Sequence, residues 1–505
     1  MERHQDKTPL DSSLQTNLER ILHDTGHSPD IVIRSLTIGK ANKTAVAVLY
    51  TEGLVNRGQL ASFVIEPISS GYQETEIEKT PQSSVLSKMK ESLVKMGDIH
   101  DCCDFEQLYP ALLSGRAIVL LDGFEKGVSI GINEWKDRGI TENIGETVVR
   151  GPREAFTETL QTNVMQIRRK IVDPSLWIEN RKIGRISQTT ISIMYVNGLV
   201  DEGVLKELKK RLDQIDIDAI LESGYIEEYI QDAWYSPFPT VYSTERPDVI
   251  AAGILEGRVA IFVDGTPFVL MVPSLFIEFY QAASDYYQRA DISTIMRFLR
   301  LISFFIALLG PSFFIAMTTF HQEMIPGAIL VGLVAQREGV PFPAFIEALL
   351  MEITFEILRE AGIRMPRAVG NAVSVVGTLV IGTAAVEAGF VSAAMVIVVS
   401  ITAISSFVVP ADSMSISIRM LRFIFMMLAA SFGLFGIMTG LILLLLHLCH
   451  LTSFGVPYFA PFGPFIWQDQ KDALFRLPRW WVRTRPHLLS KQNQERTKKV
   501  QKETS

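Results

Sequence analysis

Cysteine is scarce in this sequence of 505 residues. There are three, of which Cys102 and Cys103 are adjacent and Cys449 lies in a leucine-rich run. Three thiols placed in this way cannot form a disulfide framework, which is typical of a protein in a reducing compartment. The sequence also lacks the glycine-rich nucleotide-binding motifs, the Gly-x-Ser-x-Gly nucleophile motif and the His-Glu-x-x-His zinc motif. We therefore expect no enzyme activity and no cofactor.

Charged residues are scarce in parts of the second half of the chain. Four stretches contain no formal charge and are long enough to cross a hydrocarbon core of about 30 Å: 301–320, 368–386, 388–411 and 423–446. Two further segments are apolar but carry prolines: 324–358, which also contains glutamates, and 451–467. We expect these two to return through the membrane, either fully or as re-entrant segments.

The arginines predict the orientation of these spans, because basic residues gather on the cytoplasmic side. Arginine clusters precede three of the four uncharged stretches, and residues 476–505 carry nine basic and two acidic residues. Placing every cluster inside gives three membrane hairpins, namely 301–320 with a return in 324–358, 368–386 with 388–411, and 423–446 with a return in 451–467. The N-terminus has no signal peptide, so we expect both termini in the cytoplasm. The clusters are Arg297 with Arg300, Arg359 with Arg364 and Arg367, and Arg419 with Arg422.

The region before residue 297 contains an internal duplication. Residues 48–60 match residues 193–205 at an offset of 145, and residues 113–123 match residues 255–265 at an offset of 142. Each copy contains an apolar strand, a glycine turn and a helix, then a helix end, a second strand and an Asp-Gly turn. The pattern predicts two small α/β units.

Polar residues in these repeats fit structural roles. Asp122 and Asp264 fit the Asp-Gly turns of hairpins better than a ligand site, and Arg116 and Arg258 fit ion-paired turn residues. A ligand between the two units stays open. Nothing in the sequence indicates nucleic-acid binding. His447, Cys449 and His450 have metal-binding residue types, but at the end of an apolar span they favour an interfacial position, and we expect no metal site.

Two patterns in the membrane region have functional interpretations. Glu352, Glu356 and Glu360 are four residues apart on one helix face, which favours either an acidic ring at a cation pore or an interfacial helix neutralised by Arg359 and Arg364. Small residues also recur every four positions on a predicted span and favour close helix packing or a water-filled path. These are Gly370, Ser374, Thr378 and Gly382.

Four motifs resemble the signatures of the GerA-type spore germination proteins, and the similarity covers residues 30–485 in the order of the family's A subunit. The motifs are Asp264-Gly-Thr-Pro-Phe-Val, Arg150-Gly-Pro-Arg-Glu, Ala372-Val-Ser-Val-Val-Gly-Thr-Leu-Val-Ile-Gly and Met395-Val-Ile-Val-Val-Ser-Ile-Thr-Ala-Ile. The resemblance implies a nutrient germinant receptor subunit in the spore inner membrane, acting with B and C subunits. It also implies a homo-oligomer, a pentamer in that family, that forms a ligand-gated cation channel.

Together these observations predict a multi-domain protein, with a duplicated cytoplasmic α/β domain followed by an α-helical polytopic membrane domain in contact with lipid. The predicted parts are 1–165 and 166–296 for the two α/β subdomains, 297–467 for the membrane domain and 468–505 for a basic cytoplasmic tail. The main alternative function is a signalling scaffold whose membrane part is only an anchor. A transporter is disfavoured because we find no second half that matches the Gly310-Pro311 interruption.

Overall fold

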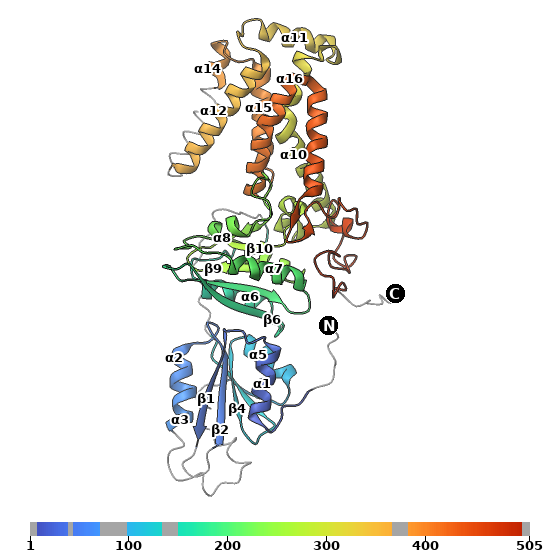
Figure 1. Ribbon diagram of the computed structural model, residues 1–505. Helices are drawn as coiled ribbons and strands as arrows, with labels where there is room; N and C mark the ends of the chain where they lie inside the picture. The colour runs from blue at the N-terminus through green and yellow to red at the C-terminus, as the bar shows by residue number, and fades with distance from the viewer. Residues whose placement is uncertain (1–7, 39–43, 71–97, 134–149, 366–381, 497–505) are drawn as a thin grey trace. The chain divides into compact units, whose positions relative to one another are not determined.

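The computed structural model describes residues 8–38, 44–70, 98–133, 150–365 and 382–496 (Figure 1). It divides the chain into two compact units. We call the first the sheet unit; it comprises Met1–Ile230, Val241–Pro273 and Arg483–Ser505. The second, the helical unit, comprises Gln231–Thr240 and Ser274–Val482. The predicted boundary between residues 296 and 297 falls inside the first long helix of the helical unit.

Two five-stranded antiparallel sheets of the same strand order form the sheet unit, which confirms the predicted duplication. The first sheet has the order β1-β2-β4-β5-β3 and the second the order β6-β7-β9-β10-β8. The first set of strands is β1 (Ile31–Ile38), β2 (Thr44–Thr51), β3 (Ile99–Cys102), β4 (Arg116–Leu121) and β5 (Gly127–Gly131). The second set is β6 (Leu176–Ile183), β7 (Thr189–Val196), β8 (Tyr242–Thr244), β9 (Val259–Val263) and β10 (Val269–Val272).

The helices of the sheet unit cover both faces of the first sheet. Successive side chains of a strand point to opposite faces, and on β2 both faces are buried: Val46 and Val48 lie in one apolar cluster, Ala47 and Leu49 in another. The helices of the first copy are α1 (Leu14–Asp24), α2 (Arg57–Gln59), η1 (Leu60–Ile65), α3 (Glu66–Ser70) and α5 (Phe105–Leu113). Those of the second copy are α6 (Leu160–Lys170), α7 (Glu202–Asp213), α8 (Ser223–Ile230) and α9 (Pro247–Ile254).

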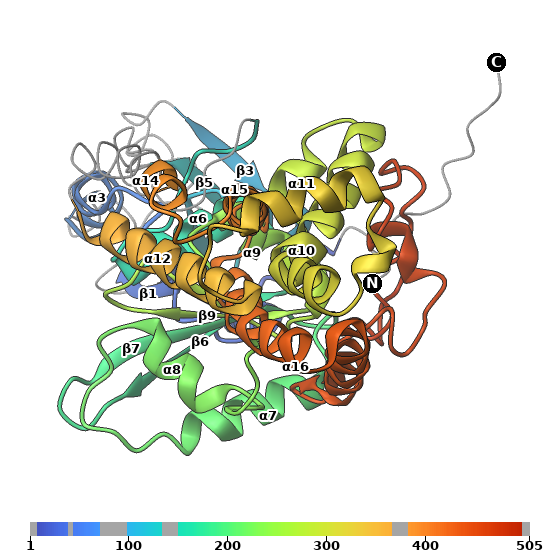
Figure 2. The same cartoon turned by 90° about the horizontal axis from the view of Figure 1, so that it is seen from above.

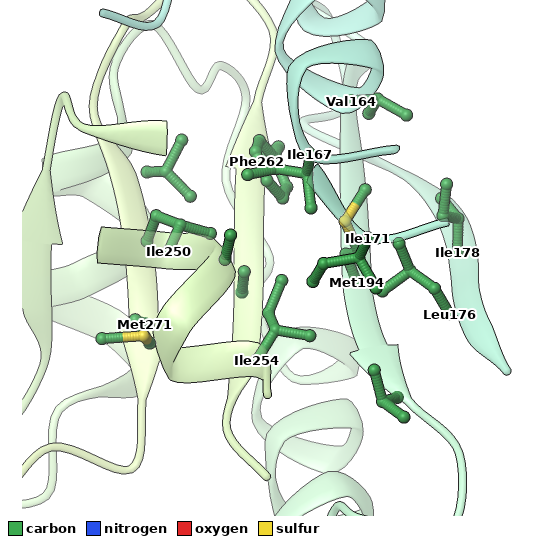
Figure 3. Close-up of a cluster of buried hydrophobic side chains, with 14 of the residues drawn as sticks. Val164, Ile167, Ile171, Leu176, Ile178, Met194, Ile250, Ile254, Phe262 and Met271 are labelled. Atoms are coloured by element: carbon green, nitrogen blue, oxygen red, sulfur yellow. The ribbon is translucent and has the colours of Figure 1, made fainter. Parts of the chain in front are cut away.

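The second sheet has an equivalent core on one face, where α6 and α9 pack on its strands (Figure 3). Ile167 of α6 and Ile254 of α9 are fully buried against Phe262 of β9 and Met194 of β7. An apolar stripe on each helix therefore closes this side of the sheet.

The duplication extends to single hydrogen bonds. The Asp122 carboxylate accepts from the Leu14 backbone N–H at the start of α1 (3.0 Å), and the Asp264 carboxylate accepts from the Leu160 N–H at the start of α6 (3.1 Å). Each aspartate is followed by a glycine with positive φ, Gly123 or Gly265. Both aspartates therefore combine a turn with a helix cap, as the structural interpretation of these residues requires.

A buried ion pair joins the two copies. Arg168, with 0 % of its surface exposed, donates to both carboxylate oxygens of Asp30 (2.8 and 3.1 Å) and to the Leu176 carbonyl (2.7 Å). Beside it, the Trp177 indole N–H donates to the Asp24 carbonyl, and its ring lies against Gly26. Arg168 belongs to the basic run 168–170, yet its guanidinium is buried because it links the two copies.

The described part of the helical unit contains six α-helices, four short 3₁₀ helices and a small hairpin. In Figure 2, α10 and α16 are seen nearly end-on. The elements are α10 (Ala290–Thr319), α11 (Gly327–Arg337), α12 (Ala344–Arg364), α14 (Gly382–Glu387), α15 (Ala393–Ser406), α16 (Asp412–His450) and the hairpin of β11 (Thr452–Ser453) and β12 (Val456–Pro457).

Two of these helices, α10 and α16, are long and apolar enough to cross a membrane, which accounts for the predicted span 301–320. The segment 324–358 is divided between α11 and α12. A full helical crossing in 451–467 is wrong, because these residues form the β11–β12 hairpin and turns instead of a helix, while a re-entrant return of this segment stays a prediction. Most of the predicted span 368–386 lies outside the described residues.

The helix α16 reverses direction at Gly433. This residue has φ 60° and ψ −141°, a backbone region that only glycine readily adopts. A Cβ built on Gly440 would lie 2.8 Å from the Phe425 ring, although these residues would be about 22 Å apart along a straight helix. The prediction of a single crossing over 423–446 is therefore wrong: α16 consists of two antiparallel arms, 412–432 and 434–450.

The segment 483–496 packs on the second copy of the sheet unit. Lys491 pairs with Asp201 (2.6 Å) and Arg496 with Glu256 (2.6 Å), while Arg485 donates to the Leu255 carbonyl. The Leu489 side chain is buried. The Lys491 ammonium holds the pKa of the Asp201 carboxyl below its usual value. The basic charge of the tail is thus partly neutralised by acidic groups of the sheet unit.

Candidate functional site

The three glutamates of the predicted acidic stripe lie on α12, and the deepest of them is sealed inside the helical unit. Glu352 accepts a hydrogen bond from the Arg422 guanidinium on the first arm of α16 (2.5 Å). Arg422 also donates to the Ala307 carbonyl of α10 (2.7 Å). The side chains of Glu352 and Arg422 are 0 % and 1 % exposed. One ion pair therefore joins three helices where neither charge can reach solvent.

The other two glutamates are also paired, at increasing exposure. Glu356 pairs with Arg419 of α16 (2.6 Å), and Glu360 pairs with Arg364 one turn further along α12 (2.7 Å). The pairs 352–422 and 356–419 run in opposite directions, so α12 is antiparallel to the first arm of α16. Glu352 and Glu356 thus join two helices. Of the two arginines predicted to neutralise the stripe, Arg364 pairs with Glu360, and Arg359 interacts electrostatically with Glu356.

A further buried carboxylate, Glu347, was missed by the sequence reasoning. It is fully buried in the first turn of α12 and accepts from the backbone N–H and the hydroxyl of Ser392, the residue that caps α15. Arg337 of α11 lies 3.3 Å away. Because Glu347 does not share the four-residue spacing of the stripe, its position in an otherwise apolar first turn was the available signal.

The small-residue face is described in part. Gly370, Ser374 and Thr378 lie outside the described residues, and Gly382 begins α14, where a Cβ would make an ordinary contact with Val396. Close helix packing is visible elsewhere, because a Cβ on Gly310 of α10 would lie 2.6 Å from the Thr402 hydroxyl of α15. The Thr402 hydroxyl itself donates to the Val398 carbonyl of its own helix. The interpretation of the face as a pore lining stays a prediction.

Arg297 and Arg300, one of the arginine clusters used to predict the topology, also form ion pairs. Arg300 forms a two-pronged ion pair with Asp285 (2.6 Å for each bond), and Arg297 pairs with Asp285 (3.3 Å) and Asp472 (3.1 Å). The two arginines and Asp285 are largely buried. They bind the first turns of α10 to one residue that precedes this helix, Asp285, and to one that follows α16, Asp472. The two arginines therefore have a structural partner that the sequence pattern did not indicate.

The residues considered as a metal site have different contacts. His447, near the end of α16, is hydrogen-bonded to Ser236 (2.9 Å between Nε2 and Oγ) and lies beside the Tyr235 and Phe238 rings. Across the described part of the chain, no three or more His, Cys, Asp or Glu side chains converge as they would around a metal ion.

Comparison with known proteins places this arrangement in a family. The model of the Bacillus/Clostridium GerA spore germination protein matches residues 17–488. The chain belongs to the GerA spore germination family. Spore germination protein KA of Bacillus subtilis (strain 168) is 48 % identical over 493 residues, which cover 98 % of this chain and 90 % of that protein. GerLA of Bacillus cereus is 36 % identical over 480 residues, covering 95 % and 96 %.

A solved structure is also similar to this GerA-family chain. The N-terminal domain of the A subunit of the Bacillus megaterium spore germinant receptor GerK3 has 39 % sequence identity and a TM-score of 0.44, covering 54 % of this chain and 99 % of that domain. The family and its relatives confirm the resemblance to the A subunit, and they make this chain a spore germination protein of that type. The two apolar helices fit an association with the membrane.

Proposed function

We propose that this chain is the A subunit of a nutrient germinant receptor in the spore inner membrane, where it acts together with B and C subunits. It crosses the membrane several times and keeps the sheet unit and both termini in the cytoplasm. Membership of the GerA family and the two long apolar helices support this proposal. The antiparallel arms of α16 also support it, because a hairpin brings its two ends to the same side of the membrane, as a cytoplasmic tail requires.

The subunit further acts as part of an oligomeric, cation-conducting channel. The observation that carries this proposal is the ion pair of Glu352 and Arg422, sealed among three helices. Ionisable groups inside membrane helices are costly and usually serve ion pathways, and a simple anchor has no need of them. In the closed state the ion pairs between α12 and α16 neutralise Glu352 and Glu356 of the acidic stripe. Separation of the two helices exposes Glu352 and Glu356 to a path lined by Gly370, Ser374, Thr378 and Gly382.

Conductance of the purified receptor tests this function. The A, B and C subunits are reconstituted together in planar bilayers, and a nutrient-dependent cation current is expected. Ser374→Trp is expected to change the current, because it places bulk on the proposed path, whereas Ser431→Trp on an exposed position of α16 is the matched control. The absence of any cation current from the intact receptor contradicts the channel.

The scaffold alternative keeps one observation in its favour. Each glutamate of the stripe already pairs with an arginine of the same chain, so the described residues of the stripe leave no uncompensated carboxylate. If the scaffold is correct, a chain in which residues 297–467 are replaced by an unrelated membrane anchor still supports germination. Loss of germination with normal protein levels favours the channel.

A further inference from the structure

A short segment of the chain leaves the sheet unit and joins the helical unit. Gln231–Thr240 lies between α8 and β8 in the sequence, yet its contacts assign it to the helical unit. Its flanks are fixed in the sheet unit, because Ile230 is fully buried and its carbonyl accepts from Arg211 (2.6 Å). On the other side Val241 is buried, and β8 pairs with β10. We call residues 231–240 the connecting segment.

The connecting segment is bonded to both arms of α16. Ser236 is hydrogen-bonded to His447 near the end of the second arm (2.9 Å), and the Pro237 carbonyl accepts from the Ser417 hydroxyl near the start of the first arm. Because the arms are antiparallel, these two positions lie at the same end of the pair. The segment therefore holds the end of α16 that is opposite to the reversal at Gly433.

Aromatic packing and the β11–β12 hairpin strengthen this attachment. The Phe238 side chain is 2 % exposed, and its ring centroid lies 6.2 Å from those of both Phe276 and His447. Phe276 in turn packs against Phe304 of α10. The hairpin adds two bonds, from the Ser453 hydroxyl to the Thr240 carbonyl (2.7 Å) and from the Phe454 N–H to the Asp232 carboxylate (2.8 Å).

A loop that served merely to connect α8 with β8 would lie on the surface and make few specific contacts. Here the backbone and side chains of the segment are hydrogen-bonded to both arms of α16 and to the β11–β12 hairpin, and Phe238 is as buried as a core residue. The segment is continuous in the chain with α8 at Ile230 and leads into β8 at Val241, so it connects that helix and that strand covalently to the ends of the two arms. A continuous chain of packed and hydrogen-bonded groups of this kind can carry coupling between distant sites.

We infer that the connecting segment is the element through which the sheet unit controls the two arms of α16, with Ser236 and Phe238 as its positioning residues. This inference rests on the proposed receptor function. It assigns the transmission of the signal to a contact inside the A subunit, whatever nutrient or partner starts it.

The test uses spores that carry the full-length chain, together with its B and C subunits, in place of the native receptor. Phe238→Ala and Ser236→Ala are compared with the matched control Trp234→Ala, since Trp234 lies in the same segment but is 84 % exposed. The amount of each variant in the spore membrane is measured first. The germination rate per receptor, in a rich medium that germinates the unmodified spores, is measured second.

The expected result is normal membrane content for all three variants and a rate about tenfold lower for Phe238→Ala and Ser236→Ala, which corresponds to a coupling of ordinary size. The rate for Trp234→Ala stays unchanged. Equal rates for all variants overturn the inference and leave the receptor function intact. No response or current from the unmodified receptor would instead contradict the proposed function itself.

A double variant keeps the test decisive if a single variant lowers the membrane content. When Ser236 and His447 act through their shared hydrogen bond, Ser236→Ala combined with His447→Phe reduces the rate per receptor no more than either change alone. His447→Gln, which keeps a hydrogen-bonding side chain, is expected to give a higher germination rate per receptor than His447→Phe. Additive losses in the double variant mean that the two residues act independently and contradict a shared contact.

Discussion

Glu352 and Arg422 lie on different helices and share a hydrogen bond of 2.5 Å with almost no exposed surface. The bond has two consequences. It brings α12 against the first arm of α16. It also buries Glu352, the residue that the sequence pattern indicated as a component of an acidic ring. The free energy of this pair depends on both partners being present, because a single buried charge is far more costly than a pair.

Removing the charge of Glu352 is expected to destabilise the helical unit. Glu352→Gln leaves the Arg422 guanidinium buried without a counter-charge, at a cost of about 3–5 kcal/mol. Glu360→Gln is the control, because its pair with Arg364 is exposed and contributes less than about 1 kcal/mol. Thermal unfolding of the full chain in lipid nanodiscs measures both. Similar shifts of the midpoint for the two variants would show that the inner pair is not sealed.

The reversal of α16 depends on glycine at position 433. In Gly433→Ala the added Cβ lies in a backbone region that disfavours it and within 3.1 Å of the His321 and Phe320 side chains. We expect a loss of about 1–3 kcal/mol. Gly332→Ala in α11 meets no atom within 4 Å and is expected to be neutral or stabilising by up to about 1 kcal/mol. Thermal unfolding in nanodiscs compares the two variants. Equal unfolding midpoints for Gly433→Ala and Gly332→Ala would contradict the reversal of α16 at Gly433.

The link between the two copies of the sheet unit is expected to be as sensitive as the pair in the helices. Arg168→Met removes three hydrogen bonds and leaves Asp30 unpaired, at a cost of about 3–5 kcal/mol. Lys170→Met is the control, because its pair with Glu154 is partly exposed and is worth less than about 1 kcal/mol. Urea unfolding followed by tryptophan fluorescence checks both, since Trp177 lies at this junction. A fluorescence transition unchanged by Arg168→Met would exclude the link.

The attachment of the tail to the sheet unit is expected to depend on the ion pair of Lys491 with Asp201. Lys491 lowers the pKa of the Asp201 carboxyl, so this pair stabilises the folded state above the ordinary aspartate pKa of about 3.9 and loses its contribution as the pH falls through the lowered value. Between pH 5 and 8 the attachment should therefore be constant. Trypsin cleavage at Lys491 measures it at pH 7 to 8, where Asp201→Asn should accelerate cleavage and Asp216→Asn, at an exposed pair, should not.

The sequence predicted the elements whose signals are local or repeated. The duplication was visible because a strand, a glycine turn and an Asp-Gly turn recur at a nearly constant offset, and the structure gives both copies the same strand order. The stretch 301–320 was visible because an uncharged apolar run of that length is uncommon outside membrane-spanning helices. Asp122 and Asp264 were understood as turn residues, although their capping of a helix more than a hundred residues earlier could not be read locally.

The missed features depend on contacts between distant residues or on a single backbone angle. The reversal at Gly433 was hidden because the run 423–446 contains three glycines, Gly433, Gly436 and Gly440, and each of them is compatible with a continuous helix. Arg168 resembled its neighbours Arg169 and Lys170, and its burial follows from Asp30 in the other copy. The pairing of Glu352 and Glu356 with Arg422 and Arg419 required knowledge of which helices meet. Spacing on one helix cannot supply that information.

The one-residue reversal at Gly433 leaves α16 no slack. Because a single residue joins the two arms, neither arm can slide along its axis independently of the other, and the pair moves as one body. A displacement at Ser417 and His447 is therefore transmitted to the opposite end of the pair, where Gly433 lies beside Phe320 and His321.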